Sequence, residues 1–299
     1  MNKTIGIFGG GQLGRMMAQA ALPLNLQCTF FEAETNCPAA ILGSVFSSKN
    51  EQGLQDFIAS ADVFSLEFEN TPVADVDVLT QTKTLHPPRL ALATAQNRLA
   101  EKALFDQLAI PVAPYRAVDS LESLKQAVAE LGLPIVLKTV TGGYDGKGQF
   151  VLRSEDQIDT AWAELGPAKS LIAESFVKFS REVSIIAVRG QNGDVKTWAL
   201  AENHHHNGIL SHSIVPAPNS TDLQPVAQDY ITRLLNHLNY VGVLTLELFV
   251  TEQGLYANEM ACRVHNSGHW SIEGAICSQF ENHIRAVAGL PLGSTDVVR

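Results

Sequence analysis

The chain has 299 residues, of which 45% are hydrophobic and 17% are charged, and its formal net charge is −10. This length is ample for a packed core and predicts two or three domains. Because so negative a chain has no basic field to attract phosphate polymers, we expect no nucleic-acid partner and no binding to an anionic membrane.

About ninety N-terminal residues alternate between strand-like and helix-like segments. A short apolar run at 4–8 is followed by the glycine loop GGGQLG and a helical stretch, and further strands are expected at 27–31 and within 61–68. This alternation indicates a parallel sheet with helices on its faces. The pair Pro87-Pro88 marks the end of this unit.

A second unit follows one helix-like segment at 91–108 and the chain breaks at Pro111 and Pro114. Because two of its strands meet directly across a glycine-rich turn, we expect their sheet to be antiparallel. Its predicted elements are a helix at 120–132, strands at 135–138 and 150–152, and a loop, TGGYDGKGQ, between these strands.

The third unit is expected to begin near Ser170. Its last two strands form a predicted hairpin about the turn at 252–254. Its predicted elements are strands at 170–175, 181–190 and 195–201, a helix at 224–239, and strands at 241–250 and 254–260.

The cysteines and the N-terminus are consistent with a reducing compartment. None of the cysteines has the CxxC spacing, so we expect free or buried thiols and neither disulfides nor a cysteine metal site. The chain starts almost directly with a strand, and we recognise neither a signal peptide nor an apolar run of membrane-spanning length. We therefore expect a cytoplasmic protein. The cysteines are Cys28, Cys37, Cys262 and Cys277.

The first glycine loop has the spacing of a dinucleotide-binding loop. Gly9, Gly11 and Gly14 follow a strand and open a helix, where backbone amides and the helix N-terminus attract a phosphate. Glu32 lies at the end of the next strand, where an acid that binds ribose is expected. From this loop alone NAD, another phosphorylated ligand and a simple tight turn all stay open.

A second set of residues is typical of a nucleotide site. Lys138 ends an apolar strand just before the glycine-rich loop, and a strand lysine of this kind can contact phosphates as a point charge. The loop amides can then close over the β- and γ-phosphates. The alternative is a hairpin tip without a ligand. Glu174 and Glu182 suit a ribose or adenine edge, although either can be a solvated surface acid.

Two acids on the last hairpin indicate a metal site. Glu247 lies inside an apolar strand and Glu259 follows Asn258 at the end of the next strand, so the hairpin brings the acids together. A carboxylate in an apolar strand is costly unless it is paired or bound to a metal, and these oxygen ligands suit Mg²⁺. The alternative is a salt bridge to Arg263. The run His204-His205-His206 cannot bind one ion together, because consecutive strand residues point to opposite faces.

Together these segments resemble the ATP-grasp superfamily, and within it the N5-carboxyaminoimidazole ribonucleotide synthases. The resemblance covers essentially the whole chain, and RVHNSGHW with GGYDGKG is its most specific part. It implies an α/β ATP-grasp fold in three subdomains, namely an N-terminal parallel βαβ (pre-ATP-grasp) domain at 1–97, a small lid at 98–170 and a C-terminal mixed α+β domain at 171–299. The motifs are GGGQLGRM, EFEN, TGGYDGKGQ, EVS, HNGIL, VGVLTLELFV and NEMACRVHNSGHW.

The resemblance also implies the ligands and the residues that bind them. The reaction would be the carboxylation of 5-aminoimidazole ribonucleotide with bicarbonate and ATP, and Mg²⁺ would be held by Glu247 and Glu259. The ribonucleotide, with its 5′-phosphate on the first glycine loop, would contact Gln12, Leu13, Glu67, Tyr144, Asp145, Arg263, His265 and Asn266. ATP would contact Arg98, Lys138, Gly143, Tyr144, Asp145, Gly146, Lys147, Gly148, Gln149, Glu174, Ser175, Phe176, Val177, Glu182, His205, Asn258 and Glu259.

The implied mechanism proceeds through carboxyphosphate in the synthesis of purines. Bicarbonate attacks the γ-phosphate, and Mg²⁺ and lysines, with Lys138 as the candidate, neutralise the charge that spreads over its oxygens. Arg263 is the candidate for holding bicarbonate and carboxyphosphate, because its planar fork matches an oxyanion pair. Asp145 is the candidate for orienting the amine or accepting its proton.

Members of the family continue for some tens of residues beyond the position of Arg299, with basic residues that contact the substrate phosphate. We therefore expect the ATP site to be complete in this chain and the affinity for the ribonucleotide to be affected. The family also implies a homodimer.

Three rival interpretations remain. The nearest is the formate-dependent glycinamide ribonucleotide transformylase, also an ATP-grasp ligase, for which we would expect an acid at position 12 and a serine-rich lid. Gln12 and Tyr144-Asp145 argue against it. An NAD(P)-dependent dehydrogenase leaves the second glycine loop and both hairpin acids unexplained, and a non-catalytic ATP-binding regulator is the third alternative.

Overall fold

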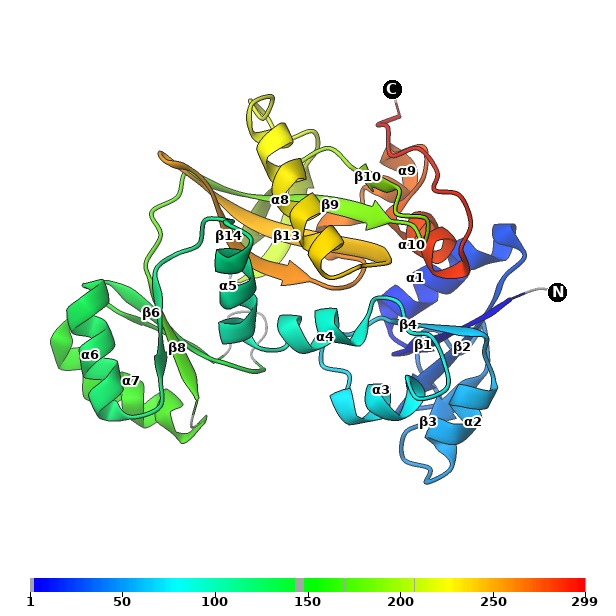
Figure 1. Ribbon diagram of the computed structural model, residues 1–299, viewed down its shortest axis with the longest axis horizontal. Coiled ribbons are helices and arrows are strands. Elements are labelled where there is room, and N and C mark those ends of the chain that lie inside the picture. Colours follow the sequence, from blue (N-terminus) through cyan, green and yellow to red (C-terminus); the bar gives the residue numbers. More distant parts are fainter. Residues whose placement is uncertain (1–2, 143–147, 169, 207, 299) are drawn as a thin grey trace.

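Three sheets organise the computed structural model, which describes residues 3–142, 148–168, 170–206 and 208–298 (Figure 1). The N-terminal sheet has the order β3-β2-β1-β4, and each pair of neighbours is parallel, as predicted. Its elements are β1 (Thr4–Phe8), α1 (Gln12–Ala21), β2 (Gln27–Glu32), β3 (Val45–Ser47), α2 (Gly53–Ala59), β4 (Val63–Leu66) and α3 (Val73–Leu79).

Aromatic packing closes one face of this sheet. Phe57 of α2 packs edge-on against Phe8 and Phe64 of the strands and stacks on Phe31. Such buried rings contribute apolar area and favourable ring geometry together. On the other face α1 packs against α10 (Gln279–Ala288), which fixes the N-terminal unit to the end of the chain (Figure 1).

The helix-like segment predicted at 91–108 is two helices. α4 (Arg89–Ala95) ends at Gln96, and α5 (Arg98–Gln107) begins after Asn97, whose side chain accepts a hydrogen bond from the Ala100 N–H. This cap satisfies an amide that the helix start leaves without a partner, so the chain can turn here. The apolar pattern continues through the break, which is why one helix was predicted.

The lid sheet consists of β5 (Tyr115–Val118), β8 (Leu171–Ser175), β6 (Ile135–Thr139) and β7 (Gln149–Leu152), in that order and antiparallel throughout. α6 (Leu121–Leu131) and α7 (Ile158–Leu165) cover it (Figure 1). The antiparallel prediction is confirmed. The predicted boundary at residue 170 is corrected, because β8 pairs with β5 and β6 of the lid and does not belong to the third unit.

The C-terminal sheet has the order β12-β11-β9-β13-β14, with β10 beside β9. The predicted hairpin is confirmed, since β13 and β14 pair up to Thr251 and Gly254. Among the described residues no helix is long and apolar enough to cross a lipid bilayer. The elements are β9 (Arg181–Arg189), β10 (Val195–Thr197), β11 (Ala201–His206), β12 (Ile209–Ile214), α8 (Leu223–His237), β13 (Gly242–Thr251), β14 (Gly254–Ala261) and α9 (Ser271–Gly274).

Strand alternation gives the two faces of this sheet different characters. Ile185 and Leu246 belong to the face that packs with the α8 residues Ile231 and Leu234 in one core. The opposite face is apolar only at one end, where residues such as Val188 pack with α10. At the other end of this face the same alternation places polar side chains, and they lie where the sheet meets the lid and the N-terminal unit. The short 3₁₀ turn η4 (Asn266–Gly268) lies near this polar end.

The four cysteines agree with their predicted state. All are free, three of them are buried and Cys37 is half-buried. Burial raises the pKa of the Cys28 thiol to about 12, so this thiol stays protonated at neutral pH.

Candidate functional site

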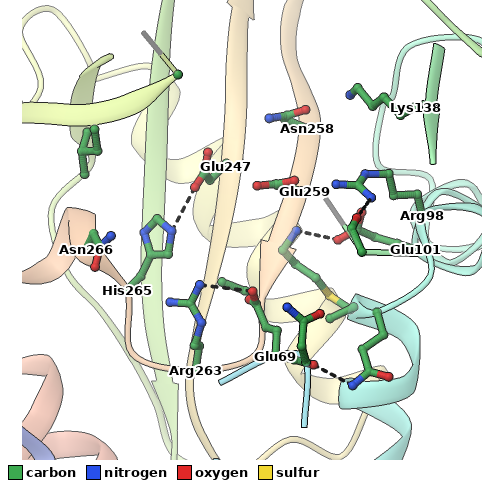
Figure 2. A pocket seen from close by; sticks show the side chains of 18 of the residues that line it. Glu69, Arg98, Glu101, Lys138, Glu247, Asn258, Glu259, Arg263, His265 and Asn266 are labelled. Atoms are coloured by element: carbon green, nitrogen blue, oxygen red, sulfur yellow. Dashed lines mark hydrogen bonds and ion pairs between the residues drawn. The ribbon is translucent and has the colours of Figure 1, made fainter. Parts of the chain in front are cut away.

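The two hairpin acids face each other on the polar end of the C-terminal sheet. Glu247 of β13 is directly opposite Glu259 of β14, and the register shifts immediately afterwards, so that Asn258 is an extra residue on its strand. A bulge of this kind re-aims the side chains beside it. Glu247, Asn258 and Glu259 accordingly line one cavity, as the hairpin pattern predicted (Figure 2).

This cavity has a volume of about 750 Å³ and lies between the lid, α5 and the C-terminal sheet. Lys138 of β6 and the residues at both described ends of the glycine-rich loop, Gly142 and Gly148, line it together with the hairpin acids. The loop after Lys138 and the acid pair therefore share one cleft. Predicted ATP residues on its wall are Arg98, Lys138, Gly148, Gln149, Glu182, His205, Asn258 and Glu259.

Several predicted ATP residues are not on the wall of this cavity. Glu174 is buried behind Lys138, and neither it nor Ser175, Phe176 or Val177 is among the residues that line the cavity. The remaining predictions in the glycine-rich loop lie outside the described residues, namely Gly143, Tyr144, Asp145, Gly146 and Lys147.

Buried charges beneath the cavity hold Lys138 in place. Glu174 lies 3.1 Å from the Lys138 ammonium and 3.7 Å from that of Lys102, which also donates to the Asn258 carbonyl. Burial alone would raise the pKa of Glu174, but the two ammonium groups outweigh it and the pKa is lowered. Glu174 is thus an ionised anchor that joins the lid, α5 and β14.

Glu101 is a site residue that the sequence reasoning missed. It is 3% exposed, lines the cavity and accepts a hydrogen bond of 2.7 Å from the Met260 N–H, next to Glu259. Burial raises the pKa of Glu101 to about 8; the charge of Lys102 acts to lower this pKa, and the charge of Glu259 acts to raise it. The available signal was an acid on the same helical face as Leu104 and Phe105, which is otherwise apolar.

The histidines follow the predicted alternation. His205 lies on the cavity side, with Nδ1 3.4 Å from Glu182, whereas His204 stacks on His212 of the neighbouring strand. The ligand atoms of Glu182, His205 and Glu247 lie within 4.8 Å of one another, so this face can also hold a cation through a mixed nitrogen and oxygen set.

The two hairpin acids, Glu247 and Glu259, have pKa values that are shifted in opposite directions. Burial opposes ionisation of Glu247, but a 3.0 Å contact with His265 Nε2 reverses the effect and the pKa is lowered. Burial away from water raises the pKa of Glu259, and the negative charges of Glu247 and Glu69 raise it further. The oxygen set formed by Glu247, Asn258 and Glu259 therefore has an excess of negative charge that fits a hard divalent cation.

Arg263 does not pair with either hairpin acid, which was the alternative to a metal site. Its Nη2 donates to Glu69 at 3.1 Å (Figure 2). Its Nη1 donates to the Val264 carbonyl. The buried Nε has no hydrogen-bond partner within the described part of the chain. Glu69 was not predicted, because it lies in a turn after the end of β4, where strand alternation no longer indicates the direction of a side chain.

A second cavity of about 520 Å³ adjoins the first, because Phe68, Asn70, Arg263 and Asn266 line both. Of the predicted substrate residues, Leu13, Glu67, Arg263 and Asn266 line this second cavity. His265 lines the first cavity, and Gln12 is not among the residues that line either one.

The first glycine loop surrounds a protein carboxylate. The N–H groups of Gly11 and Leu13 donate to Glu67 at 2.7 and 3.0 Å, and the Gly10 N–H donates to Glu32 at 3.1 Å. A Cβ on Gly9 would lie 2.6 Å from the Glu67 carboxylate, so the glycines make room for this side chain. These amides are already occupied, which corrects the expectation that they hold a phosphate.

Comparison with known proteins agrees with this arrangement. The family model of the ribonucleotide synthetase preATP-grasp domain matches residues 1–96, and that of the ATP-grasp domain matches residues 103–280. An N5-carboxyaminoimidazole ribonucleotide synthase of Pseudomonas aeruginosa is 46% identical over 293 residues, which cover 97% of this chain and 81% of that protein. The chain belongs to this family of ATP-grasp ligases.

Solved structures extend the likeness to three dimensions. The crystal structure of the synthetase from Thermus thermophilus has a TM-score of 0.93 at 46% identity and covers 98% of this chain and 80% of its own. An Aspergillus clavatus synthase in complex with ADP and 5-aminoimidazole ribonucleotide has a TM-score of 0.90 at 28% identity, covering 98% of this chain and 78% of its own. The chain therefore has the ATP-grasp fold that its motifs indicated.

The raised pKa of Glu101 generates a prediction about stability. Because the folded pKa of about 8 exceeds the ordinary value of 4.5, folding retains a proton and this group destabilises the fold as pH rises between these values. Glu101→Gln keeps an acceptor for Met260 and removes this effect. The difference in Tm between Glu101→Gln and the wild type should therefore shift in favour of the variant by about 2 °C or more between about pH 6 and about pH 8.5.

Differential scanning fluorimetry at several pH values measures this difference. Glu252→Gln, in the exposed turn of the hairpin, is the control and should follow the wild type at every pH. Parallel curves for Glu101→Gln and the wild type would show that Glu101 is ionised in the folded chain.

Proposed function

We propose that this chain carboxylates 5-aminoimidazole ribonucleotide with bicarbonate and ATP, giving N5-carboxyaminoimidazole ribonucleotide, ADP and phosphate. The observation that carries the proposal is the pair of adjoining cavities with Arg263 between them. One cavity has the cations and acids that a nucleoside triphosphate requires, and the other is a separate space for a second substrate. The Aspergillus clavatus relative, which was solved with ADP and the ribonucleotide together, supports this division.

ATP would occupy the larger cavity. Lys138 and Arg98 would provide positive charge for the phosphates, and Glu182 and His205, which line the same cavity, would form hydrogen bonds with hydroxyl groups of the ribose. Glu174 would act on Lys138 and not on the nucleotide, because its carboxylate is buried between two lysines. The rest of the glycine-rich loop, at 143–147, lies outside the described residues and remains a predicted contact for the phosphates.

Glu247 and Glu259 would hold Mg²⁺, with Asn258 as a further oxygen donor. Their excess negative charge and their position opposite Lys138 fit this ion better than a lone salt bridge would. When bound, Mg²⁺ would neutralise oxygens of the β- and γ-phosphates. The mixed set with Glu182 and His205 is a poorer match, since Mg²⁺ prefers oxygen ligands.

The ribonucleotide would lie in the smaller cavity. Its acidic wall, with Glu32, Glu67 and Asp75, favours hydroxyl and amine donors and repels a phosphate, so the 5′-phosphate should point away from the first glycine loop. Carboxylation would require the exocyclic amine to face Arg263 and the ATP cavity, so the ribose hydroxyls would be the donors that meet the acidic wall. Asp145 remains the proposed group for orienting the amine.

The chemistry would take place at the junction of the two cavities. A bicarbonate oxygen attacks the γ-phosphorus and the bond to ADP breaks, which forms carboxyphosphate. Arg263 would hold the carboxylate of this intermediate, and the cavity walls would keep bulk water away from it. The amine then attacks the carboxyl carbon, inorganic phosphate leaves and the amine loses a proton.

Further properties follow from the same assignment. As an enzyme of purine synthesis, the chain would work in the cytoplasm, where ATP, bicarbonate and the ribonucleotide are available. Its thiols are all free, which fits a reducing compartment. We also propose a homodimer, as the family resemblance implies.

The assay that tests this function measures phosphate release from ATP with each co-substrate omitted in turn. We expect turnover only when bicarbonate and 5-aminoimidazole ribonucleotide are both present, because the amine must capture the carboxyphosphate. Equal turnover with formate in place of bicarbonate, or with glycinamide ribonucleotide as acceptor, would identify the rival transformylase.

Substitution of Glu259 by Gln should nearly abolish ATP turnover. Loss of one hard anionic ligand removes transition-state charge stabilisation worth several kcal/mol, so we expect kcat to fall on the order of 100-fold or more. Phosphate release as a function of Mg²⁺ concentration measures the effect, with Glu252→Gln on the same hairpin as the unaffected control. Near-normal turnover at saturating Mg²⁺ would remove Glu259 from the site.

Substitution of Arg263 by Ala should separate ATP binding from carboxylation. The Kd for ATP should stay within about threefold of the wild type, whereas carboxylation should fall on the order of 100-fold, as for loss of one oxyanion donor. Calorimetry and product analysis measure the two quantities. Glu69→Gln releases Arg263 from its partner without removing the cation and should retain most activity, and an equal loss in both variants would indicate a purely structural ion pair.

A further inference from the structure

A continuous chain of hydrogen bonds crosses the polar end of the C-terminal sheet. The Ser213 hydroxyl donates to Asn203 at 2.8 Å, the Asn203 amide donates to Ser184 at 3.0 Å, and the Ser184 hydroxyl donates to Ser267 at 2.8 Å. Ser267 Oγ then lies 2.9 Å from Nδ1 of His265. The chain thus begins on β12 and passes through β11, β9 and η4 to the histidine beside Glu247.

The backbone determines the direction of this chain. The N–H of Ser267 donates to His265 Nδ1 at 3.3 Å, so Nδ1 must be an acceptor without a proton. The neutral ring therefore carries its proton on Nε2, the nitrogen that lies 3.0 Å from Glu247. The hydroxyls agree with this direction, because Ser267 accepts from Ser184 and its own proton is left to point at Nδ1.

The consequence for Glu247 is a fixed hydrogen bond on one carboxylate oxygen. His265 Nε2–H donates to Oε1, which holds the carboxyl plane and leaves Oε2 for the cavity side. Were the proton on Nδ1, a lone pair of Nε2 would face a carboxylate, and the two would repel each other. The orientation of Glu247 thus depends on which nitrogen of His265 carries the proton.

These side chains are polar but buried, and packing by itself does not explain why polar residues occupy these positions. Ser184, Ser267 and Asn203 are 0%, 1% and 6% exposed. Ser184 shares its face of β9 with Ile186, and an apolar side chain there would suit a strand without any need for hydrogen-bond partners. A buried polar chain is favourable only when each member is satisfied, and the Ser267 N–H is satisfied here only when His265 Nδ1 accepts its hydrogen bond.

We propose that Ser184 and Asn203 are positioning residues for the cation site. Through Ser267 they keep His265 in its Nε2–H form, so that Glu247 presents a free oxygen to the cavity. The inference rests on the proposed function in so far as Glu247 binds Mg²⁺. Neither residue lines the cavity, and both would act through His265.

The decisive variants differ by one hydroxyl. In Ser184→Ala the Ser267 hydroxyl loses its donor and becomes free to accept from Nδ1–H, whereas Ser184→Thr keeps the hydroxyl on a residue that strands accommodate well. Ser65→Ala is the matched control, since Ser65 is also fully buried and bonds a buried histidine, His283, at 2.7 Å. Asn203→Leu, which removes the amide donor at similar volume, is an independent second variant.

Two measurements test the proposal, namely the ¹⁵N shifts of His265 and the dependence of turnover on Mg²⁺. Side-chain ¹⁵N chemical shifts, assigned with His265→Asn, should report the Nε2–H form in the wild type and in Ser184→Thr, and a detectable Nδ1–H population in Ser184→Ala and Asn203→Leu. The apparent KM for Mg²⁺ should rise about tenfold in the latter two, as for loss of an outer-shell partner, and should be restored in Ser184→Thr. Ser65→Ala should lower the Tm but leave the His265 ¹⁵N shifts and the apparent KM for Mg²⁺ unchanged.

The proposal is overturned if Ser184→Ala and Asn203→Leu lower Tm while the His265 shifts and the Mg²⁺ dependence stay as in the wild type. Failure of the proposed function has a different result. The wild type would then show no turnover dependent on bicarbonate, while the ¹⁵N shifts of the variants would still report whether the chain controls His265.

Discussion

The arrangement of the site depends on two carboxylates that face each other across one hairpin. Glu247 and Glu259 are direct cross-strand neighbours, and like charges at this separation raise the free energy of the fold unless a cation or a proton balances them. The surrounding residues provide part of that balance. His265 donates to Glu247, and Lys138 faces the acids from the lid, so the site is prepared for a ligand that carries both phosphates and a cation.

Buried charge also connects the parts of the fold that the site requires. Lys102 of α5 reaches the carbonyl of Asn258 and the carboxylate of Glu174, and Glu174 in turn holds Lys138. A single network therefore ties the lid sheet to the bulge that re-aims the hairpin side chains. Loss of one member would leave an uncompensated charge in the interior. Ion pairs, as well as apolar packing, therefore hold the lid in its position relative to the C-terminal sheet.

The glycine loop shows how one motif can have different partners. Its spacing and its place between a strand and a helix are those of a phosphate-binding loop, yet its amides donate to Glu67 and Glu32. An acid from the neighbouring strand occupies the space that a phosphate would take, and the helix N-terminus favours either anion. The motif predicted a phosphate at this position, whereas the structure has protein carboxylates there.

The sequence by itself determined the order of the three units, the types of residue in the site and most of the strands, although β3, β5 and β12 were not predicted. The alternation of strands with helices predicted the parallel sheet, and the glycine-rich turn between two strands predicted the antiparallel one. Two apolar strands around a short turn predicted the hairpin that joins Glu247 to Glu259. All of these are local patterns. Motif order was sufficient for the family. The alternation along 204–206 likewise placed His205 and His204 on opposite sides.

Only the tertiary structure decided which partners these residues have. The assignment of β8 to the lid, the pairing of Arg263 with Glu69, and the buried position of Glu101 each depend on segments far apart in the chain. The same is true of the hydrogen bonds that link Ser184 to Ser267, which are 83 residues apart. Local sequence encodes the direction in which a side chain points from its strand, whereas its neighbour is set by how the sheets pack, and that information is spread over the whole chain.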